Sequence, residues 1–171
     1  MAVEQNKKAN FPRAGFRRRF GAWVYDVLLA ISVYMLAGVV SSIILHLLVS
    51  NGILSQRGYQ HEIDVLLNTP WLMIANEIWK GGWVAFFFIY FWSKSGQTLG
   101  MRAWRLRVQN RDGSLISKKV ALKRLLPTLL GLGNLWILFD RKHKLSLQDK
   151  LTNTEVVRLS LAENKGKDWV N

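Results

Sequence analysis

The side chains best placed to do chemistry are charged residues in or beside long apolar runs. Asp26 lies inside the apolar run 20–50, and Arg19 precedes it by seven residues. Seven residues are nearly two helical turns, so both side chains lie on one face. An ionised carboxylate in hydrocarbon costs at least ~2.5 kcal/mol, so Asp26 is expected to point into the protein. It acts there as a proton or cation site, or as a buried anchor. The anchor is favoured, tying the helix to Arg19, Arg124 or the segment around Asn134.

Two further carboxylates carry weaker signals. Glu77 lies in a second apolar run and shares a helix face with Lys80, three residues later. The favoured interpretation is an interfacial ion pair whose ends reach outward, and the alternative is a relay in which Glu77 assists Asp26. Asp149 lies in a predicted turn, where it caps a helix or pairs with a basic residue of the segment 94–124. A structural role is favoured for Asp149.

Composition and spacing exclude several classes of function. The chain has no Cys, which excludes disulfides, thiol nucleophiles and thiolate metal sites. Its three His, at positions 46, 61 and 143, show no metal-ligand spacing. The glycine-containing segment 96–100 lacks the Gly-Lys-Ser/Thr ending of a phosphate-binding loop, which argues against a nucleotide site there. Because the sequence shows no nucleophile paired with a base, we expect neither an enzyme nor a cofactor.

Two apolar runs are long enough to cross a membrane, since a bilayer core about 30 Å thick requires ~20 apolar residues in a helix. The run 20–50 exceeds that length, and the run 70–92 has Trp residues near its ends, as is typical at the headgroup level. We therefore predict spanning helices over about 20–45 and 70–92. A third run, 125–139, is short and contains Pro127 and two glycines, so a broken or re-entrant segment is expected.

The distribution of charge predicts the orientation in the membrane. Lys and Arg number 24 against 11 acids, which gives a formal net charge of +13. Residues 1–19 hold six Lys and Arg, the segment 94–124 holds nine, and the loop 51–69 holds only Arg57. Because basic loops stay in the cytoplasm, we expect both termini and 94–124 inside and the loop 51–69 outside. The basic residues would then meet anionic lipid headgroups, so nucleic-acid binding is not expected.

The segment 94–124 has its own expected elements. Residues 104–109 alternate apolar and polar side chains, and a turn signal precedes residues 114–116, so a small β-hairpin is predicted. Residues 155–161 are a further strand candidate, and together with the hairpin they are expected to form a three-stranded patch at the membrane surface. Gly96 suits a helix end, and Thr98, before Gly100, suits a helix start. Residues 118–126 have the pattern of an amphipathic interfacial helix whose basic side chains reach toward headgroups: Lys118, Lys119, Lys123 and Arg124.

The chain is expected to form one membrane domain, 14–160, since 171 residues suit a single small bundle. That domain ends in a cytoplasmic segment, 140–160. A basic N-terminal tail, 1–13, and a polar C-terminal tail, 161–171, flank it and are expected to be mobile.

Three short blocks carry a resemblance to a known family. They are Arg18-Arg19-Phe20-Gly21-Ala22 before Asp26, Gly96-x-Thr98-x-Gly100 before Leu106-Arg107-Val108, and Leu145-Ser146-Leu147-Gln148-Asp149 before Thr154. Over roughly residues 14–160 the chain resembles the RDD family, small and mostly bacterial membrane proteins named for one arginine and two aspartates. The resemblance implies that Arg19, Asp26 and Asp149 are those positions. Two departures are a basic residue displaced to Arg102 and Asn153 in place of a small residue.

Two hypotheses of function follow, both for an all-α membrane protein with two transmembrane helices, a broken third hydrophobic segment and a small cytoplasmic β-hairpin patch. The favoured one is a scaffold or accessory subunit of the bacterial inner membrane. It binds anionic lipid or a membrane partner protein through its basic cytoplasmic face. The other is an oligomeric cation/proton exchanger that uses Asp26 with Glu77, an activity proposed for some members of the family that the chain resembles. Two helices enclose no pathway, so the exchanger requires a homo-oligomer.

Overall fold

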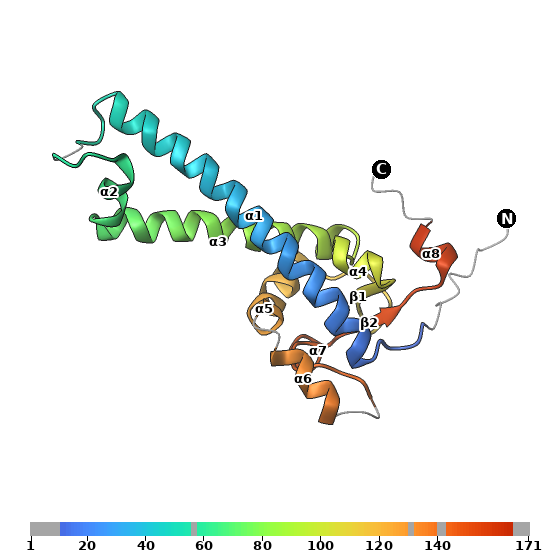
Figure 1. Cartoon of the computed structure of the whole chain (residues 1–171). Helices are drawn as coiled ribbons and strands as arrows, with labels where there is room; N and C mark the ends of the chain where they lie inside the picture. The colour runs from blue at the N-terminus through green and yellow to red at the C-terminus, as the bar shows by residue number, and fades with distance from the viewer. Residues whose placement is uncertain (1–10, 56–57, 130–131, 140–142, 166–171) are drawn as a thin grey trace. The chain divides into compact units, whose positions relative to one another are not determined.

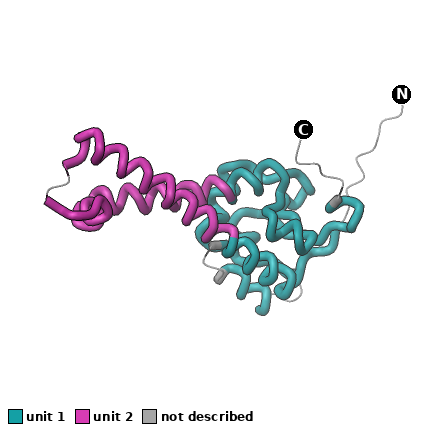
Figure 2. The backbone as a smooth tube through the Cα atoms, turned by 45° about the horizontal axis from the view of Figure 1, so that its top comes forward, with its two compact units in different colours: residues 1–28, 88–171 teal, residues 29–87 magenta. Residues whose placement is uncertain are grey.

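The computed structural model describes residues 11–55, 58–129, 132–139 and 143–165. The chain divides into two compact units, unit 1 with residues 1–28 and 88–171 and unit 2 with residues 29–87 (Figure 2). The long helices are α1 (Phe16–Ser50) and α3 (Pro70–Lys94), labelled in Figure 1. The shorter helices are α2 (Glu62–Leu67), α4 (Leu99–Ala103), α5 (Lys118–Leu129), α6 (Leu132–Phe139), α7 (Leu147–Thr152) and α8 (Leu161–Lys165).

Helices α1 and α3 confirm the two predicted apolar helices. They have 35 and 25 residues, and both are apolar enough to cross a membrane. At 1.5 Å per residue they are about 52 and 37 Å long, more than the ~30 Å of a hydrocarbon core. Many of their large apolar side chains are exposed, among them Leu36 and Ile78. A continuous apolar exterior of this kind suits a lipid environment.

The third hydrophobic segment is broken, as predicted. Helices α5 and α6 differ in direction by 77° and amount to a third span only when they are counted together. Pro127 lies inside α5. By itself α6 has eight residues, about 12 Å, which is too short to cross a bilayer. Helix α5 therefore contains both the amphipathic helix expected over 118–126 and the first part of the apolar run 125–139.

The predicted β-hairpin within 104–116 is wrong. Strand β1 (Leu106–Asn110) pairs antiparallel with β2 (Thr154–Arg158), which the sequence offered only as a further candidate. The expected turn does form, because the Gly113 amide donates to the Asn110 carbonyl at 2.9 Å. Residues 114–117 then lead into α5 and form no strand. In this pairing the buried Val156 and Val157 of β2 lie opposite Val108 and Arg107 of β1.

Parts of both predicted tails make contacts where the structure describes them. The Arg158 amide donates to the Pro12 carbonyl at 2.9 Å, and Arg13 pairs with Glu155 at 2.8 Å, so residues 12 and 13 are held against β2. In the C-terminal segment, residues 161–165 form α8, and Asn164 accepts from the Gln97 side-chain amide at 3.0 Å. The rest of these tails, 1–10 and 166–171, lies outside the described residues.

Unit 2 contains the second part of α1, the loop 51–69 and most of α3. The Trp79 indole donates to the Ala37 carbonyl at 3.2 Å, which ties α3 to α1 within this unit. His46 lies 2.8 Å from Glu62 at the start of α2. The loop 51–69 thus contains one short helix, α2.

Candidate functional site

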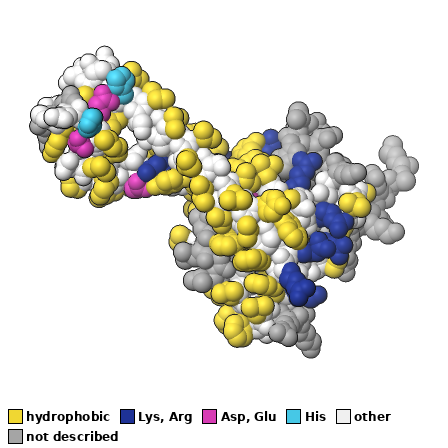
Figure 3. Space-filling view, viewed as in Figure 1, with side chains coloured by type: hydrophobic (Ala, Val, Ile, Leu, Met, Phe, Trp, Pro, Cys, Tyr) yellow, Lys and Arg dark blue, Asp and Glu magenta, His cyan; other side chains and the backbone are white. Residues whose placement is uncertain are grey.

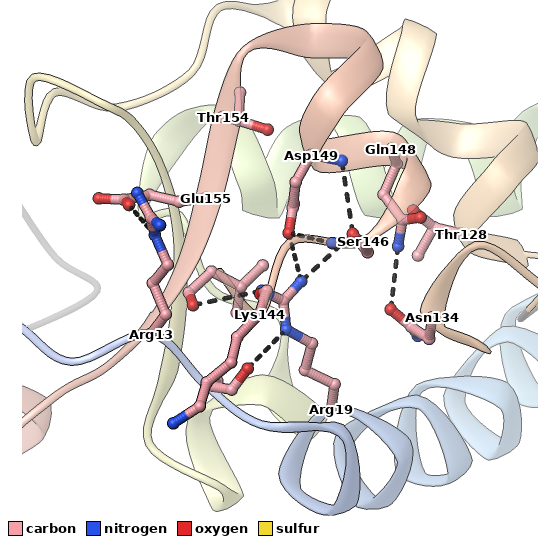
Figure 4. A network of polar contacts seen from close by, with 12 residues as sticks. Arg13, Arg19, Thr128, Asn134, Lys144, Ser146, Gln148, Asp149, Thr154 and Glu155 are labelled. Carbon is pink, nitrogen blue, oxygen red and sulfur yellow. Dashed lines mark hydrogen bonds and ion pairs between the residues drawn. The ribbon is translucent and has the colours of Figure 1, made fainter. Parts of the chain in front are cut away.

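Arg19 and Asp149 form a buried ion pair in unit 1. Arg19 Nη1 donates to Asp149 Oδ2 at 2.5 Å, and the two side chains are 3% and 0% exposed. The Arg19 side chain also donates to the Ala14 carbonyl at 3.1 Å and to the Lys144 carbonyl at 3.0 Å. Figure 4 shows the guanidinium pointing toward Asp149 and Ser146. Arg19 therefore connects the first turn of α1 to the first turn of α7 and to the segment that precedes α7.

Arg124 is the second cation on Asp149. Arg124 Nη2 donates to Asp149 Oδ1 at 2.8 Å, and Nη1 donates to the hydroxyl of Thr154. The prediction that Asp149 pairs with a basic residue of 94–124 is confirmed. The prediction that Arg124 reaches toward headgroups is wrong, because its side chain is only 4% exposed. Its position on the buried side of α5 brings it to Asp149.

Asp149 also caps a helix, as predicted. Ser146 is the N-cap of α7, and its hydroxyl accepts from the Asp149 amide at 3.4 Å while Asp149 Oδ2 accepts from the Ser146 amide at 3.1 Å. This reciprocal pair is a capping box. Burial favours the neutral acid, yet attraction to Arg19 and Arg124 outweighs burial and lowers the pKa of Asp149 below its ordinary value. Asp149 is accordingly an ionised structural centre.

Asp26 points into the protein, as predicted, but its partners are not the predicted ones. Asp26 Oδ2 accepts from the Thr98 hydroxyl at 2.7 Å, and Oδ1 accepts from the Gly100 amide at 3.1 Å. Among the described residues, Asp26 forms no hydrogen bond or ion pair with Arg19 or Arg124. Thr98 is the N-cap of α4, where helix amides lack partners within the helix. The carboxylate thus binds the buried N-terminal end of a short helix, and its partner Thr98 is 72 residues away in the chain.

The two glycines of the segment 96–100 are required by backbone conformation and by steric fit, in addition to the capping role of Thr98. Gly96 follows α3 with a φ of +73°, a conformation that favours glycine. At Gly100, a Cβ would lie 2.5 Å from Asp26 Oδ1 and 2.7 Å from the Ala22 carbonyl oxygen. Only glycine allows α4 to approach α1 this closely. The expected roles of Gly96 in a helix end and of Thr98 in a helix start are confirmed.

Glu77 is not brought together with the other candidate residues. It accepts from Lys80 Nζ at 2.5 Å and from the Tyr34 hydroxyl, and its side chain is 53% exposed. These partners lie in unit 2, whereas Asp26 lies in unit 1. The shared face of Glu77 and Lys80 is confirmed. A relay between Glu77 and Asp26 stays a prediction.

The residues around Asp26 and the Asp149 cluster line one cavity in unit 1. It has a volume of about 60 Å³, and its polar lining comes from Arg19, Trp23, Asp26, Trp92, Arg124, Thr128, Asn134 and Gln148. The Gln148 side chain donates to Asn134 Oδ1 at 3.0 Å (Figure 4). Sequence reasoning missed Gln148 as a site residue, although it directly precedes Asp149 in the third block. Within the described residues, no group of three or more His, Cys, Asp or Glu could hold a metal ion.

Comparison with known proteins gives one match. A model of the RDD family matches residues 13–153, which include Arg19, Asp26 and Asp149. No curated protein and no solved structure matches the chain.

Proposed function

The chain belongs to the RDD family and carries two apolar helices long enough to cross a bilayer; on this basis we propose a non-catalytic scaffold or accessory subunit of the bacterial inner membrane. The observation that carries the proposal is that the three charged residues for which the family is named are bound within the protein. Arg19 and Asp149 bind each other, and Asp26 binds α4. Because these groups hold elements of unit 1 together, the chemistry left for a partner lies on the exposed basic surface.

Helix α5 presents the part of that surface best suited to lipid. Lys118, Lys119 and Lys123 are exposed, and we call them the α5 lysines. Beside them Leu122 is 58% and Leu126 is 72% exposed. Exposed leucines next to long basic side chains are typical of a helix at the headgroup level. The basic surface of unit 1 extends beyond α5, and Figure 3 shows Lys and Arg side chains gathered along one edge of that unit beside a hydrophobic surface.

The charge distribution supports a cytoplasmic position for both termini and for the α5 lysines. In the described part of unit 1, the exposed acids are Asp112 and Glu163. Each basic residue near an anionic leaflet contributes roughly 1 kcal/mol of attraction. The partners we propose are therefore anionic headgroups, together with a second copy of the chain or another membrane protein.

Lipid retention tests this proposal. The purified chain would be placed in nanodiscs of phosphatidylcholine with phosphatidylglycerol, and co-purifying lipid counted by native mass spectrometry. We expect retained phosphatidylglycerol in wild type and its loss when all three α5 lysines are changed to Gln. A matched control removes the same charge at exposed positions outside α5: Arg111→Gln, Lys144→Gln and Arg158→Gln. Equal retention in the two triple variants would contradict a specific role for α5.

The exchanger hypothesis is tested separately. Both oxygens of Asp26 already accept hydrogen bonds, which favours the anchor role over a proton or cation site. In vesicles with an imposed pH gradient, we expect no collapse of the gradient when sodium, potassium or lithium is added. A collapse that is present in wild type and absent in a folded, inserted Asp26→Asn variant would replace the scaffold with an exchanger.

A further inference from the structure

Unpartnered polar atoms are concentrated around the cavity of unit 1. Among the described residues, four buried side-chain nitrogen or oxygen atoms have no hydrogen-bond partner. They are Trp23 Nε1, Trp92 Nε1, Arg124 Nε and Gln148 Oε1, and all four residues line this cavity. Trp92, Arg124 and Gln148 are each at most 3% exposed. Buried polar groups are nearly always paired, so this concentration in one place calls for an occupant.

The chemistry of these atoms selects the occupant. Three of them are N–H donors, which an occupant must meet with acceptor oxygens, and none of the three can coordinate a cation. Gln148 Oε1 is an acceptor and calls for an O–H on the same occupant. An oxyanion with a hydroxyl offers both, whereas a halide offers no donor.

The local charge also favours an anion. Arg19 and Arg124 share the single carboxylate of Asp149, which leaves one positive charge over in that cluster. One of the three unpaired N–H donors, Nε of Arg124, belongs to this cluster and carries part of its positive charge. Asp26 also lines the cavity and offsets part of this positive charge, but its two oxygens accept from Thr98 and Gly100, so the N–H of Arg124 stays available to an anion. Charge-assisted hydrogen bonds are stronger than neutral ones, which places the anion at Arg124.

Size is compatible with a group larger than one water molecule. A cavity needs a volume of roughly 10–15 Å³ to hold a single water molecule. The cavity in unit 1 has a volume of about 60 Å³. We propose that this cavity is a binding site for a phosphate-type oxyanion, held by the N–H groups of Trp23, Trp92 and Arg124. The phosphate belongs to an inorganic ion or to a phospholipid headgroup. The site is distinct from the α5 lysines, so its failure and that of the proposed function are separable.

Thermal unfolding in detergent tests the site. At matched ionic strength, we expect sodium phosphate, compared with sodium chloride, to raise the unfolding temperature of delipidated wild type. Trp92→Phe removes one donor and keeps an aromatic ring, so phosphate should bind about tenfold more weakly. Trp23→Phe gives a second, independent loss of a donor. The matched control is Trp71→Phe, because Trp71 is 62% exposed and does not line the cavity.

A second kind of variant is expected to strengthen phosphate binding, whereas the tryptophan variants weaken it. Asp26→Asn removes a negative charge from the lining and should tighten phosphate binding.

Native mass spectrometry of the purified protein distinguishes the two sources of phosphate, the inorganic ion and the phospholipid headgroup. A stoichiometric phospholipid lost in Trp92→Phe identifies a headgroup, and a phosphate response without bound phospholipid identifies the free ion. Equal responses to phosphate and chloride, or a response unchanged in both Trp92→Phe and Trp23→Phe, would overturn the proposal. Wild type without response and without bound phospholipid would leave water as the occupant and also overturn it.

Discussion

The guanidinium of Arg19 lies 2.5 Å from the carboxylate of Asp149, although 130 residues separate them in the chain. Arg124 binds the other oxygen of the same carboxylate at 2.8 Å. One buried anion thus joins the start of α1, the middle of α5 and the first turn of α7. Removing a charge from such a group leaves the remaining charges buried without compensation.

Asp149→Asn should be strongly destabilising. The change leaves two buried guanidiniums facing a neutral amide, and breaking a buried ion pair in this way costs about 3–5 kcal/mol. Unfolding by denaturant in detergent, followed by tryptophan fluorescence, measures the loss. Glu155→Gln is the control, since its pair with Arg13 is partly exposed and contributes about 1 kcal/mol or less. Similar losses in the two variants would argue against a special role for the buried pair.

The contribution of Asp149 should depend on pH in a defined direction. Its pKa is lower in the folded protein than the ordinary value of 3.8. The stabilisation is therefore complete above pH 3.8 and is lost as pH falls through the folded pKa. We expect the difference in free energy of unfolding between wild type and Asp149→Asn to be constant near neutral pH and to shrink in strong acid. A difference that shrinks already between pH values of about 7 and 5 would contradict this assignment.

Gly100→Ala should disturb the contact between α4 and α1. The added methyl group would collide with Asp26 Oδ1 and with the Ala22 carbonyl, and a collision with backbone cannot be relieved by a rotamer change. Overpacking of this kind costs about 1–3 kcal/mol, measurable as a lower unfolding temperature in detergent. Gly15→Ala is the control, because nothing lies within 4 Å of its Cβ position. A stable Gly100→Ala variant would show that α4 moves freely away from α1.

The orientation in the membrane can be read directly, because the chain has no Cys and each introduced thiol is the only one. Gln60, Ser117 and Ser160 are exposed positions in the loop 51–69, before α5 and before α8. We expect an impermeant thiol reagent added to intact cells to label Gln60→Cys. Ser117→Cys and Ser160→Cys should be labelled only after lysis. Labelling of Ser117→Cys in intact cells would reverse the proposed topology.

The sequence alone identified the features that depend on local composition. The helices over 70–92 and from Phe20 onward were predictable from the length of their apolar runs. An apolar run long enough to cross the bilayer core is rare in a soluble protein. The break around Pro127 and the capping roles of Thr98 and Asp149 were likewise predictable, since caps and breaks act within a few residues. Asp26 was correctly placed on an inward face because the period of the helix is fixed.

Tertiary structure decided which of these groups meet. Residues 106–110 are followed by a turn and by the nearby strand candidate 114–116, yet β1 pairs with β2, in which Val156 and Val157 are buried. Arg124 had the pattern of a headgroup-facing residue, yet it binds Asp149, and Asp26 binds α4 and no arginine. Residue type and spacing fix what each side chain is able to do and which face it occupies. Which of several suitable partners a side chain meets depends on how the chain folds back on itself. Local sequence does not encode which distant segments come together.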